Sequence, residues 1–169
     1  MKIYLIQPGE NDSTYLTEEG VWQINSLARR MINDRVSAER IYVNGHDISR
    51  QSGHILSKSL KIPVVSDERF VDVNKNVVLG EIDSYEFENL ENITCFIDEI
   101  VNKGKDAIVV IGEGVHRVFI SKLTGMPLRE TRHFSLMHTG ISVLEYLNNG
   151  STGNWRMSLL NDRAHLNVP

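Results

Sequence analysis

Two glycine-containing segments of the sequence have the residue types from which α/β proteins build binding and catalytic sites. QPGEN at residues 7–11 and GEGVHR at residues 112–117 each follow an apolar run. Glycine permits a tight turn between a strand and a helix, and the backbone N–H groups of such a turn can face an anion. Because ligands of open α/β sheets bind at the carboxyl ends of strands, the two segments predict a site for a phosphate or carboxylate group.

Four side chains near these turns could act as acids or bases. Glu10 and Glu113 follow the two turns, His116 lies in the second segment, and His46 precedes a predicted helix. Carboxylate and imidazole groups in contact with a substrate are the usual general acids and bases. A structural interpretation also stands for each: Glu10 can cap a helix, Glu113 can be solvated, and a lone histidine is more often a surface or packing residue.

A metal site is a further possibility for these residues. His46, Glu113 and His116, together with Asp72, could converge on zinc or manganese. The spacing does not demand it, since the sequence has no His-x-x-x-His or Cys-x-x-Cys motif. We therefore predict no metal and no cofactor.

The elements that must position these residues alternate between strand and helix. Residues 2–6, 39–43 and 106–114 read as strands, the last one apolar enough to be buried on both faces. Residues 141–146 and 155–160 read as a hairpin. Helices are predicted after Thr17, which is a plausible N-cap, and over the following ranges: 50–60, 90–101 and 115–122.

This alternation predicts one domain over residues 1–169. The expected architecture is α/β, a three-layer α/β/α sandwich with a mostly parallel sheet and a C-terminal hairpin. Residues 66–88 carry mixed signals and are interpreted as a long loop or lid.

Composition excludes several classes of partner. The 169 residues carry a net charge of −4 without a basic block, so we expect no nucleic acid partner. No apolar run approaches the roughly 20 residues that cross a bilayer, so we expect no membrane span. The single cysteine, Cys95, indicates a cytoplasmic protein, and its apolar helical context predicts a buried packing residue.

The sequence resembles the histidine phosphatase superfamily along essentially its whole length. The resemblance is to the phosphoglycerate mutase-like group, whose first strand ends in Arg-His-Gly. The stretches that carry it follow one another in the order and spacing of that family: MKIYLI-x-x-GE, LTEEGVWQINSLA, IYVNGHDISRQSGHIL, IVVIGEGVHRVFISKLTGMPL, GISVLEY and WRMSLLNDRAHL.

The resemblance implies that most of the family's reactive positions are changed here. The histidine that attacks phosphorus corresponds to Pro8, and the arginine before it to Gln7. A second arginine corresponds to Ile48, and a second histidine to Gly112. The general acid is matched only by Asp72.

These replacements remove the inherited chemistry. Phosphohistidine formation needs an imidazole lone pair and a cationic cradle for the phosphoryl oxygens. Proline and isoleucine provide neither. Losing one arginine at a phosphoryl-transfer site costs on the order of 10³–10⁵ in rate, and losing a covalent nucleophile costs about 10⁶.

We therefore predict a pseudoenzyme that forms a homodimer and binds a small ligand or a protein partner. Two alternatives stay open: an enzyme of altered chemistry using Glu10, Glu113, His46 or His116, and a residual phosphatase or mutase. Arg50 lies about 200° around a helix from Ile48 and should point away from the site unless the helix begins after it. The candidate site residues are Gln7, Gly9, Glu10, Asn44, His46, Arg50, Asp72, Glu113 and His116.

Overall fold

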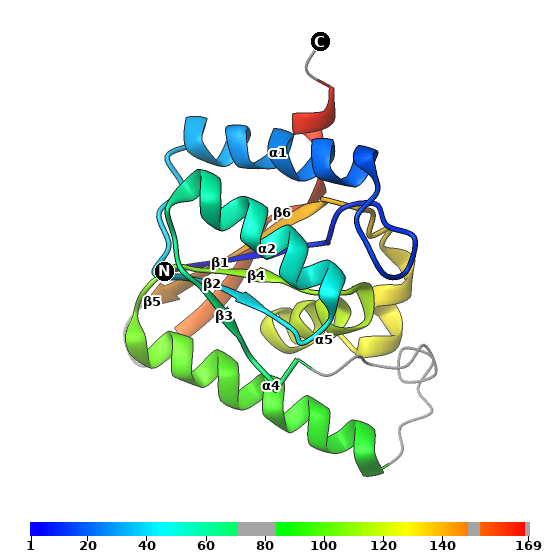
Figure 1. Cartoon of the computed structure of the whole chain (residues 1–169). Helices are drawn as coiled ribbons and strands as arrows, with labels where there is room; N and C mark the ends of the chain where they lie inside the picture. Colours follow the sequence, from blue (N-terminus) through cyan, green and yellow to red (C-terminus); the bar gives the residue numbers. More distant parts are fainter. Residues whose placement is uncertain (71–83, 149–152, 168–169) are drawn as a thin grey trace.

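A six-stranded sheet forms the centre of the computed structural model, which describes residues 1–70, 84–148 and 153–167 (Figure 1). The strand order is β3-β2-β4-β1-β5-β6. The strands are β1 (Lys2–Ile6), β2 (Arg40–Val43), β3 (Val64–Ser66), β4 (Ala107–Val110), β5 (Ile141–Asn148) and β6 (Gly153–Asp162).

The sheet is parallel except for its last two strands. β1 pairs in parallel with β4, as β2 does with β4 and with β3. β5 runs antiparallel to β1, and β6 antiparallel to β5. The predicted mostly parallel sheet and C-terminal hairpin are therefore confirmed. β3 was not predicted, because three residues after Pro63 are too few to show a pattern.

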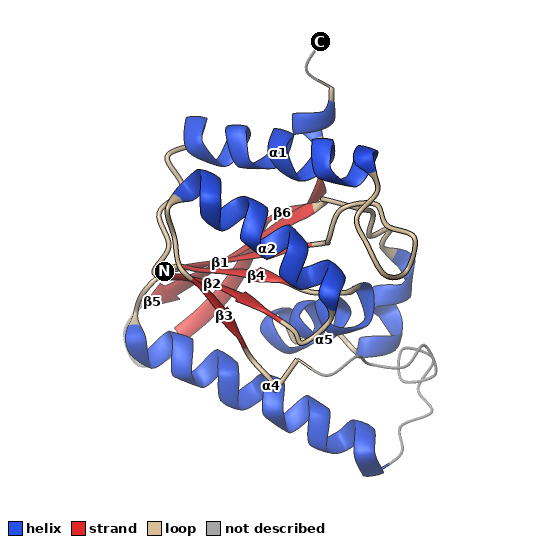
Figure 2. Cartoon of the chain, viewed as in Figure 1, coloured by secondary structure: helices blue, strands red, loops and turns tan. Residues whose placement is uncertain are grey.

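Helices cover both faces of the sheet (Figure 2). One face carries α1 (Glu18–Asn33) and α2 (Asp47–Leu60), and the other carries α4 (Ser84–Lys103) and α5 (Glu113–Thr124). Two short 3₁₀ helices, η1 (Leu128–His133) and η2 (Ala164–Leu166), complete the described structure. The three-layer prediction is confirmed.

Alternation along the strands divides the core in two. Ile3 and Leu5 of β1 pack with α4 and α5, whereas Tyr4 and Ile6 pack with α1 and α2. β4 is buried on both faces, as its continuous apolar run predicts. α1 contributes its apolar stripe, and Thr17 caps this helix by accepting a 3.0 Å hydrogen bond from the N–H of Gly20.

Three predicted features need correction. α2 begins at Asp47, three residues before the predicted start, so Arg50 lies within the helix. α4 begins at Ser84, which makes the last part of the predicted loop helical, while residues 71–83 lie outside the described residues. Cys95 is exposed, because it lies about 200° around α4 from buried Ile93.

The segment after β1 lies directly against the first turn of α1. A Cβ added to Gly20 would lie 2.0 Å from the carbonyl oxygen of Glu10, and one added to Gly9 would lie 2.6 Å from the carbonyl oxygen of Gly20. Two hydrogen bonds hold this approach: the N–H of Thr17 donates to the carbonyl of Glu10 at 3.0 Å, and the N–H of Glu10 donates to Oε1 of Gln23 at 3.1 Å. A side chain at either position would clash with the backbone of the other segment, so both positions require glycine.

This contact predicts that Gly20→Ala destabilises the fold by about 2–4 kcal/mol, since the methyl group must push two backbones apart. Gly45→Ala is the matched control, because a Cβ at Gly45 meets nothing within 4 Å. It should change stability by less than about 0.5 kcal/mol. Urea denaturation measures both; equal stability of the two variants would contradict the packing argument.

Candidate functional site

A cleft of about 610 Å³ opens at the carboxyl ends of β1, β2 and β4. It is formed by the turns that follow these strands, by the start of α2, and by the segment between η1 and β5. The residues that line it are Gln7, Pro8, Asn11, Ser13, Asn44, His46, Ile48, Ser49, Gly112, Glu113, Leu136, Met137 and His138.

The parallel strands bring together the four positions that the resemblance marks as altered. Gln7 and Pro8 directly follow β1, Gly112 follows β4, and Ile48 lies in the first turn of α2 after β2. All four line the cleft. Residues far apart in the sequence therefore share one site because their strands end at the same edge of the sheet.

The cleft wall carries little side-chain charge. Among the described residues that line it, none is a lysine or an arginine, and Glu113 is the one carboxylate. Oε1 of Glu113 accepts hydrogen bonds from Nε (3.0 Å) and Nη2 (2.5 Å) of Arg117, four residues along α5. The carboxylate is thus neutralised by its own helix.

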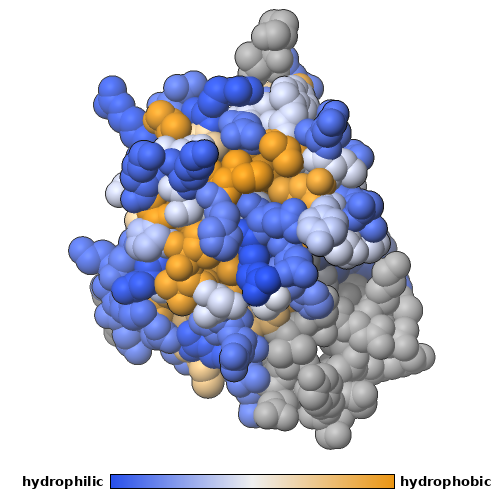
Figure 3. Space-filling model, viewed as in Figure 1, coloured by the Kyte–Doolittle hydropathy of each residue, from blue (hydrophilic) through white to orange (hydrophobic). Residues whose placement is uncertain are grey.

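Arg50 lies outside the cleft, contrary to its place among the candidate residues. Its guanidinium is exposed and donates to Asp47. Arg50 borders a shallow groove with Leu16, Val21 and Ile55, where apolar atoms gather between α1 and α2 (Figure 3). The rotation of about 200° from Ile48 has this effect because the helix begins before both residues.

Two helix N-termini meet the cleft without a side-chain cap. His46 is the N-cap of α2 and Gly112 that of α5, and neither cap position accepts a side-chain hydrogen bond from its helix. The positive ends of the two helix dipoles therefore face the cleft edge. Backbone N–H groups are the source of positive potential that lining side chains do not supply.

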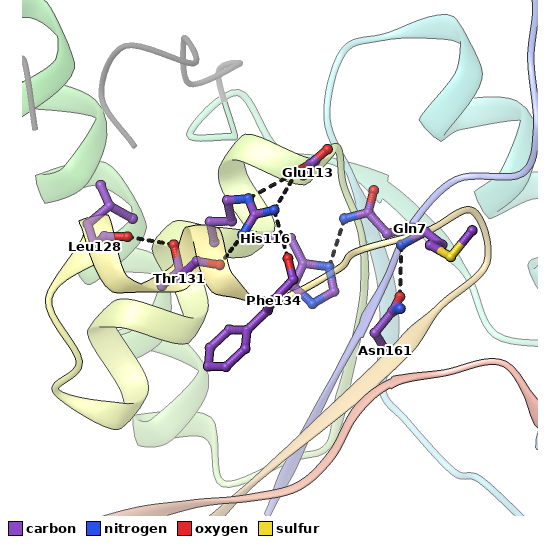
Figure 4. A network of polar contacts seen from close by, with 9 residues as sticks. Gln7, Glu113, His116, Leu128, Thr131, Phe134 and Asn161 are labelled. Carbon is purple, nitrogen blue, oxygen red and sulfur yellow. Dashed lines mark hydrogen bonds and ion pairs between the residues drawn. The ribbon is translucent and has the colours of Figure 1, made fainter. Parts of the chain in front are cut away.

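A buried chain of hydrogen bonds fixes Gln7 in the cleft wall. Figure 4 shows its amide directed at the His116 ring, with Nε2 of Gln7 3.0 Å from Nδ1 of His116. Nε2 of His116 in turn lies 3.0 Å from Oγ of Ser142. The amide N–H₂ can only donate, so Nδ1 of His116 accepts and its Nε2–H donates to Ser142. Ser142 Oγ also accepts from the N–H of Asn161 at 3.0 Å.

His116 is held neutral in this position. Burial, followed by the nearby charge of Arg117, lowers the pKa of His116 from 6.5 to about 3. Both ring nitrogens are engaged, and the side chain does not line the cleft. His116 therefore has no lone pair to offer a substrate or a metal, and its predicted structural interpretation fits its surroundings.

Arg117 connects α5 to the far rim of the cleft. Its Nη1 donates to the carbonyl of Thr131 in η1, and its Nη2 donates to the carbonyl of Phe134 at 3.0 Å (Figure 4). The chain then continues directly into Leu136, Met137 and His138, which line the cleft. The arginine thus positions a rim that the sequence analysis did not include.

Among the described residues of the cleft wall, Asn44 has a buried side-chain oxygen without a hydrogen-bond partner. It directly follows β2, is 1% exposed, and its Oδ1 accepts no hydrogen bond from the described residues. An unpaired buried acceptor costs about 1–3 kcal/mol. Because Oδ1 is closed to solvent, a hydrogen-bond donor bound in the cleft recovers that cost when the Asn44 side chain turns toward it.

The other candidates lie at or near this site. His46 lines the cleft, whereas Gly9 and Glu10 lie just outside its lining; Oε1 of Glu10 is 3.4 Å from Oγ1 of Thr17. Asp72 lies outside the described residues. Sequence reasoning missed two features of the lining, which are Ser49 in the first turn of α2 and the turn at Asn11–Ser13. In that turn the N–H of Ser13 donates to Oδ1 of Asn11 at 3.1 Å, a contact that is typical of Asn in turns.

Over the described ranges, no three histidine, cysteine or acidic side chains cluster closely enough to hold a metal ion. The helices of the same ranges are all too short or too polar to cross a lipid bilayer.

Comparison with known proteins agrees with this architecture. The family model of the histidine phosphatase superfamily (branch 1) matches residues 88–163, a little under half of the chain. No curated protein matches the chain. Among solved structures, the phosphoserine phosphatase of Entamoeba histolytica with 3-phosphoglyceric acid is 18% identical at a TM-score of 0.79, over 98% of both chains.

Two further solved structures are also similar to the chain. Bacillus stearothermophilus YhfR is 16% identical at a TM-score of 0.79, over 98% of each chain. The alpha-ribazole phosphatase of Shigella flexneri is 17% identical at a TM-score of 0.74, over 96% of this chain and 97% of its own. The TM-scores show that these proteins share the fold of this chain. The family match and the fold together confirm the resemblance to the phosphoglycerate mutase-like histidine phosphatases.

The neutral state of His116 predicts an acid-sensitive fold. The folded chain takes up this proton only near pH 3, whereas the unfolded chain takes it up near pH 6.5. Stability is therefore fully present above pH 6.5 and falls as the pH drops, by about 1.4 kcal/mol per pH unit for this histidine.

His116→Gln should remove that contribution. We expect its free energy of unfolding, measured by urea denaturation between about pH 6 and pH 4.5, to fall less steeply than that of the unmodified chain. His133→Gln, at an exposed histidine, is the control and should keep the original slope. Parallel slopes for the unmodified chain and His116→Gln would show that His116 is charged in the fold.

Proposed function

We propose that this protein uses a histidine phosphatase fold to bind a ligand in its cleft and carries no phosphoryl group on a histidine. One observation carries the proposal: the cleft positions that correspond to the family's nucleophile and its arginines hold Pro8, Gln7 and Ile48. A proline ring therefore stands in place of the nucleophile, and an amide and a hydrocarbon side chain stand in place of the two arginines.

The size and polarity of the cleft support a small-molecule ligand. Its volume of about 610 Å³ lies within the range of small-molecule pockets, about 300–1,000 Å³. The unpaired Oδ1 of Asn44 favours a ligand that donates a hydrogen bond. The absence of lysine and arginine from the described lining disfavours a phosphate dianion, so we propose a neutral polar ligand or one with a single charge.

An enzyme of altered chemistry is less well supported. Of its four candidate groups, Glu10 and His116 lie outside the lining of the cleft. The carboxylate of Glu10 contacts Thr17, and the ring nitrogens of His116 contact Gln7 and Ser142. His46 and Glu113 do line the cleft, but Glu113 is paired with Arg117. A residual phosphatase is supported by the likeness to solved phosphatase structures and by none of the lining residues.

We also propose a cytoplasmic protein that forms a homodimer. The single cysteine supports a reducing compartment. The dimer is supported only by the resemblance to a group that has many dimeric members.

Absence of phosphoryl transfer is directly measurable. The purified chain should show no turnover of an aryl phosphate above a boiled sample, and no acid-labile label after incubation with a phosphohistidine-forming donor. The physical reason is the missing nucleophile at Pro8. Turnover that falls at least about tenfold in His46→Gln, or label on His46 or His116, would contradict the proposal.

A gain-of-binding variant tests the electrostatic argument. Ile48→Arg places a guanidinium in the cleft, so inorganic phosphate should raise its melting temperature in a saturable way. The unmodified chain should show no such shift, and neither should His54→Arg, which adds a guanidinium elsewhere on the exposed surface of α2. Saturable stabilisation of the unmodified chain at about pH 8, where inorganic phosphate is mostly the dianion, would overturn the argument that the cleft disfavours a phosphate dianion.

A further inference from the structure

A second cavity, of about 750 Å³, lies between α1 and η2, away from the cleft. Figure 1 shows η2 beside α1, close to the C-terminus. Its wall includes Trp22, Arg29 and Arg30 of α1, Asp34 at the C-cap of this helix, and His165 of η2. The proposed function does not use any of these residues.

Arg30 presents an unpaired donor here. Its Nη2 donates to Oδ2 of Asp162 at 2.7 Å, and its Nε donates to Oδ2 of Asp34 at 3.3 Å. Its Nη1 is buried and donates to none of the described residues. Two sides of the guanidinium are therefore fixed by carboxylates, and the third side has unused hydrogen-bonding capacity.

His165 presents an unpaired acceptor in the same cavity. The side chain is 4% exposed, and its Nε2 lies 3.1 Å from Oγ1 of Thr139. That hydroxyl donates to the carbonyl of His138 at 2.7 Å, so it accepts from Nε2–H of His165. Nδ1 of His165 then carries the lone pair, and it accepts from none of the described residues.

The two unpaired atoms belong to neighbouring groups. Burial and then the charge of Arg30 lower the pKa of His165 to about 4, which keeps the ring neutral and Nδ1 an acceptor. The same shift reflects the charges of Asp162 and Arg163, so both of these side chains are also near the ring. The arginine donor and the histidine acceptor can therefore serve one small ligand.

The surrounding charge selects the charge of that ligand. Among the described residues that line the cavity, Arg29 and Arg30 are positive and Asp34 is negative, which gives the lining a net charge of +1. Arg29 is exposed, and its Nη2 donates to Oγ of Ser26 at 2.9 Å. A single negative charge balances this set, whereas a dianion would exceed it.

We propose that this cavity binds a small monoanion that also donates a hydrogen bond, of the hydroxycarboxylate type. Nη1 of Arg30 donates to the carboxylate, and Nδ1 of His165 accepts from the hydroxyl. Both atoms are closed to solvent, so the ligand reaches them when side chains of the cavity wall rotate. Trp22 and Arg29 are exposed and can move without disturbing the core.

Glycolate and acetate form a matched pair of probes, because only glycolate carries a hydroxyl. Trp22 fluorescence is followed in the full chain carrying Trp155→Phe, which leaves Trp22 as the sole tryptophan. At constant ionic strength, glycolate should give a saturable change, and acetate should bind at least about tenfold more weakly.

Variants assign the two contacts. His165→Phe keeps an aromatic ring without the acceptor and should abolish the preference for glycolate over acetate. Arg30→Gln should weaken both anions at least about tenfold, and Arg29→Gln, at an exposed residue, should weaken both even if Arg30→Gln fails to fold. Arg132→Gln, at an exposed arginine of η1, is the control and should change neither.

Three results would overturn the proposal. They are no saturable response to glycolate, equal affinity for glycolate and acetate in the unmodified cavity, and glycolate affinity that is unchanged in both His165→Phe and Arg29→Gln. Because the cavity shares no lining residue with the cleft, none of these results bears on the proposed function.

Discussion

The hydrogen bond between the Gln7 amide and the neutral His116 ring is the constraint on which the cleft depends. Through it and the Ser142 hydroxyl, the end of β1, the first turn of α5, and the start of β5 are held in one buried network. A guanidinium at position 7 would meet a ring that burial and Arg117 already keep unprotonated, but it would bring an unpaired charge to the site. The amide donates a hydrogen bond to the ring without bringing a charge. An uncharged residue at position 7 therefore suits both the cleft wall and the buried hydrogen bonds behind it.

Charged side chains at the starts of the two helices that face the cleft are also neutralised by ion pairs. The acidic residue in the first turn of α2, Asp47, pairs with Arg50, and the one in α5, Glu113, pairs with Arg117. In each case the cation lies on the same helix and is directed away from the ligand space. Positive potential in the cleft therefore comes from backbone N–H groups, which are weaker than arginines and favour a different kind of ligand.

Sequence reasoning located the buried parts of the fold well, because burial leaves a local pattern. The run from Ala107 to Val110, the stripe of α1 and the cap at Thr17 each depend on neighbours in the sequence, and each was predicted. β3 was missed because a three-residue strand is fixed by its pairing with β2. The start of α2 was placed three residues late because its N-cap, His46, is not one of the usual capping residue types. Cys95 was assigned to the core because apolar neighbours on both sides concealed its exposed position on the helix.

The candidate site was predicted where it follows an apolar strand or where the resemblance marks a position. Gln7 and Gly112 belong to segments that follow apolar runs, and the carboxyl ends of parallel strands are recognisable in a sequence. Asn44 and Ile48 were identified through the resemblance. Met137 and His138 were not, since they reach the cleft through hydrogen bonds from Arg117 to two carbonyls more than ten residues away. No residue type or spacing near position 137 indicates that Arg117 positions this segment.

The contact between Gly9 and Gly20 has a consequence for affinity. Where two backbones touch without side chains between them, the segment they hold has little freedom left to lose. Pro8, whose ring already restricts its own φ, lies next to this contact. One wall of the cleft is therefore preorganised before any ligand arrives, so association there pays almost no conformational entropy, and binding discriminates by shape rather than by adaptation.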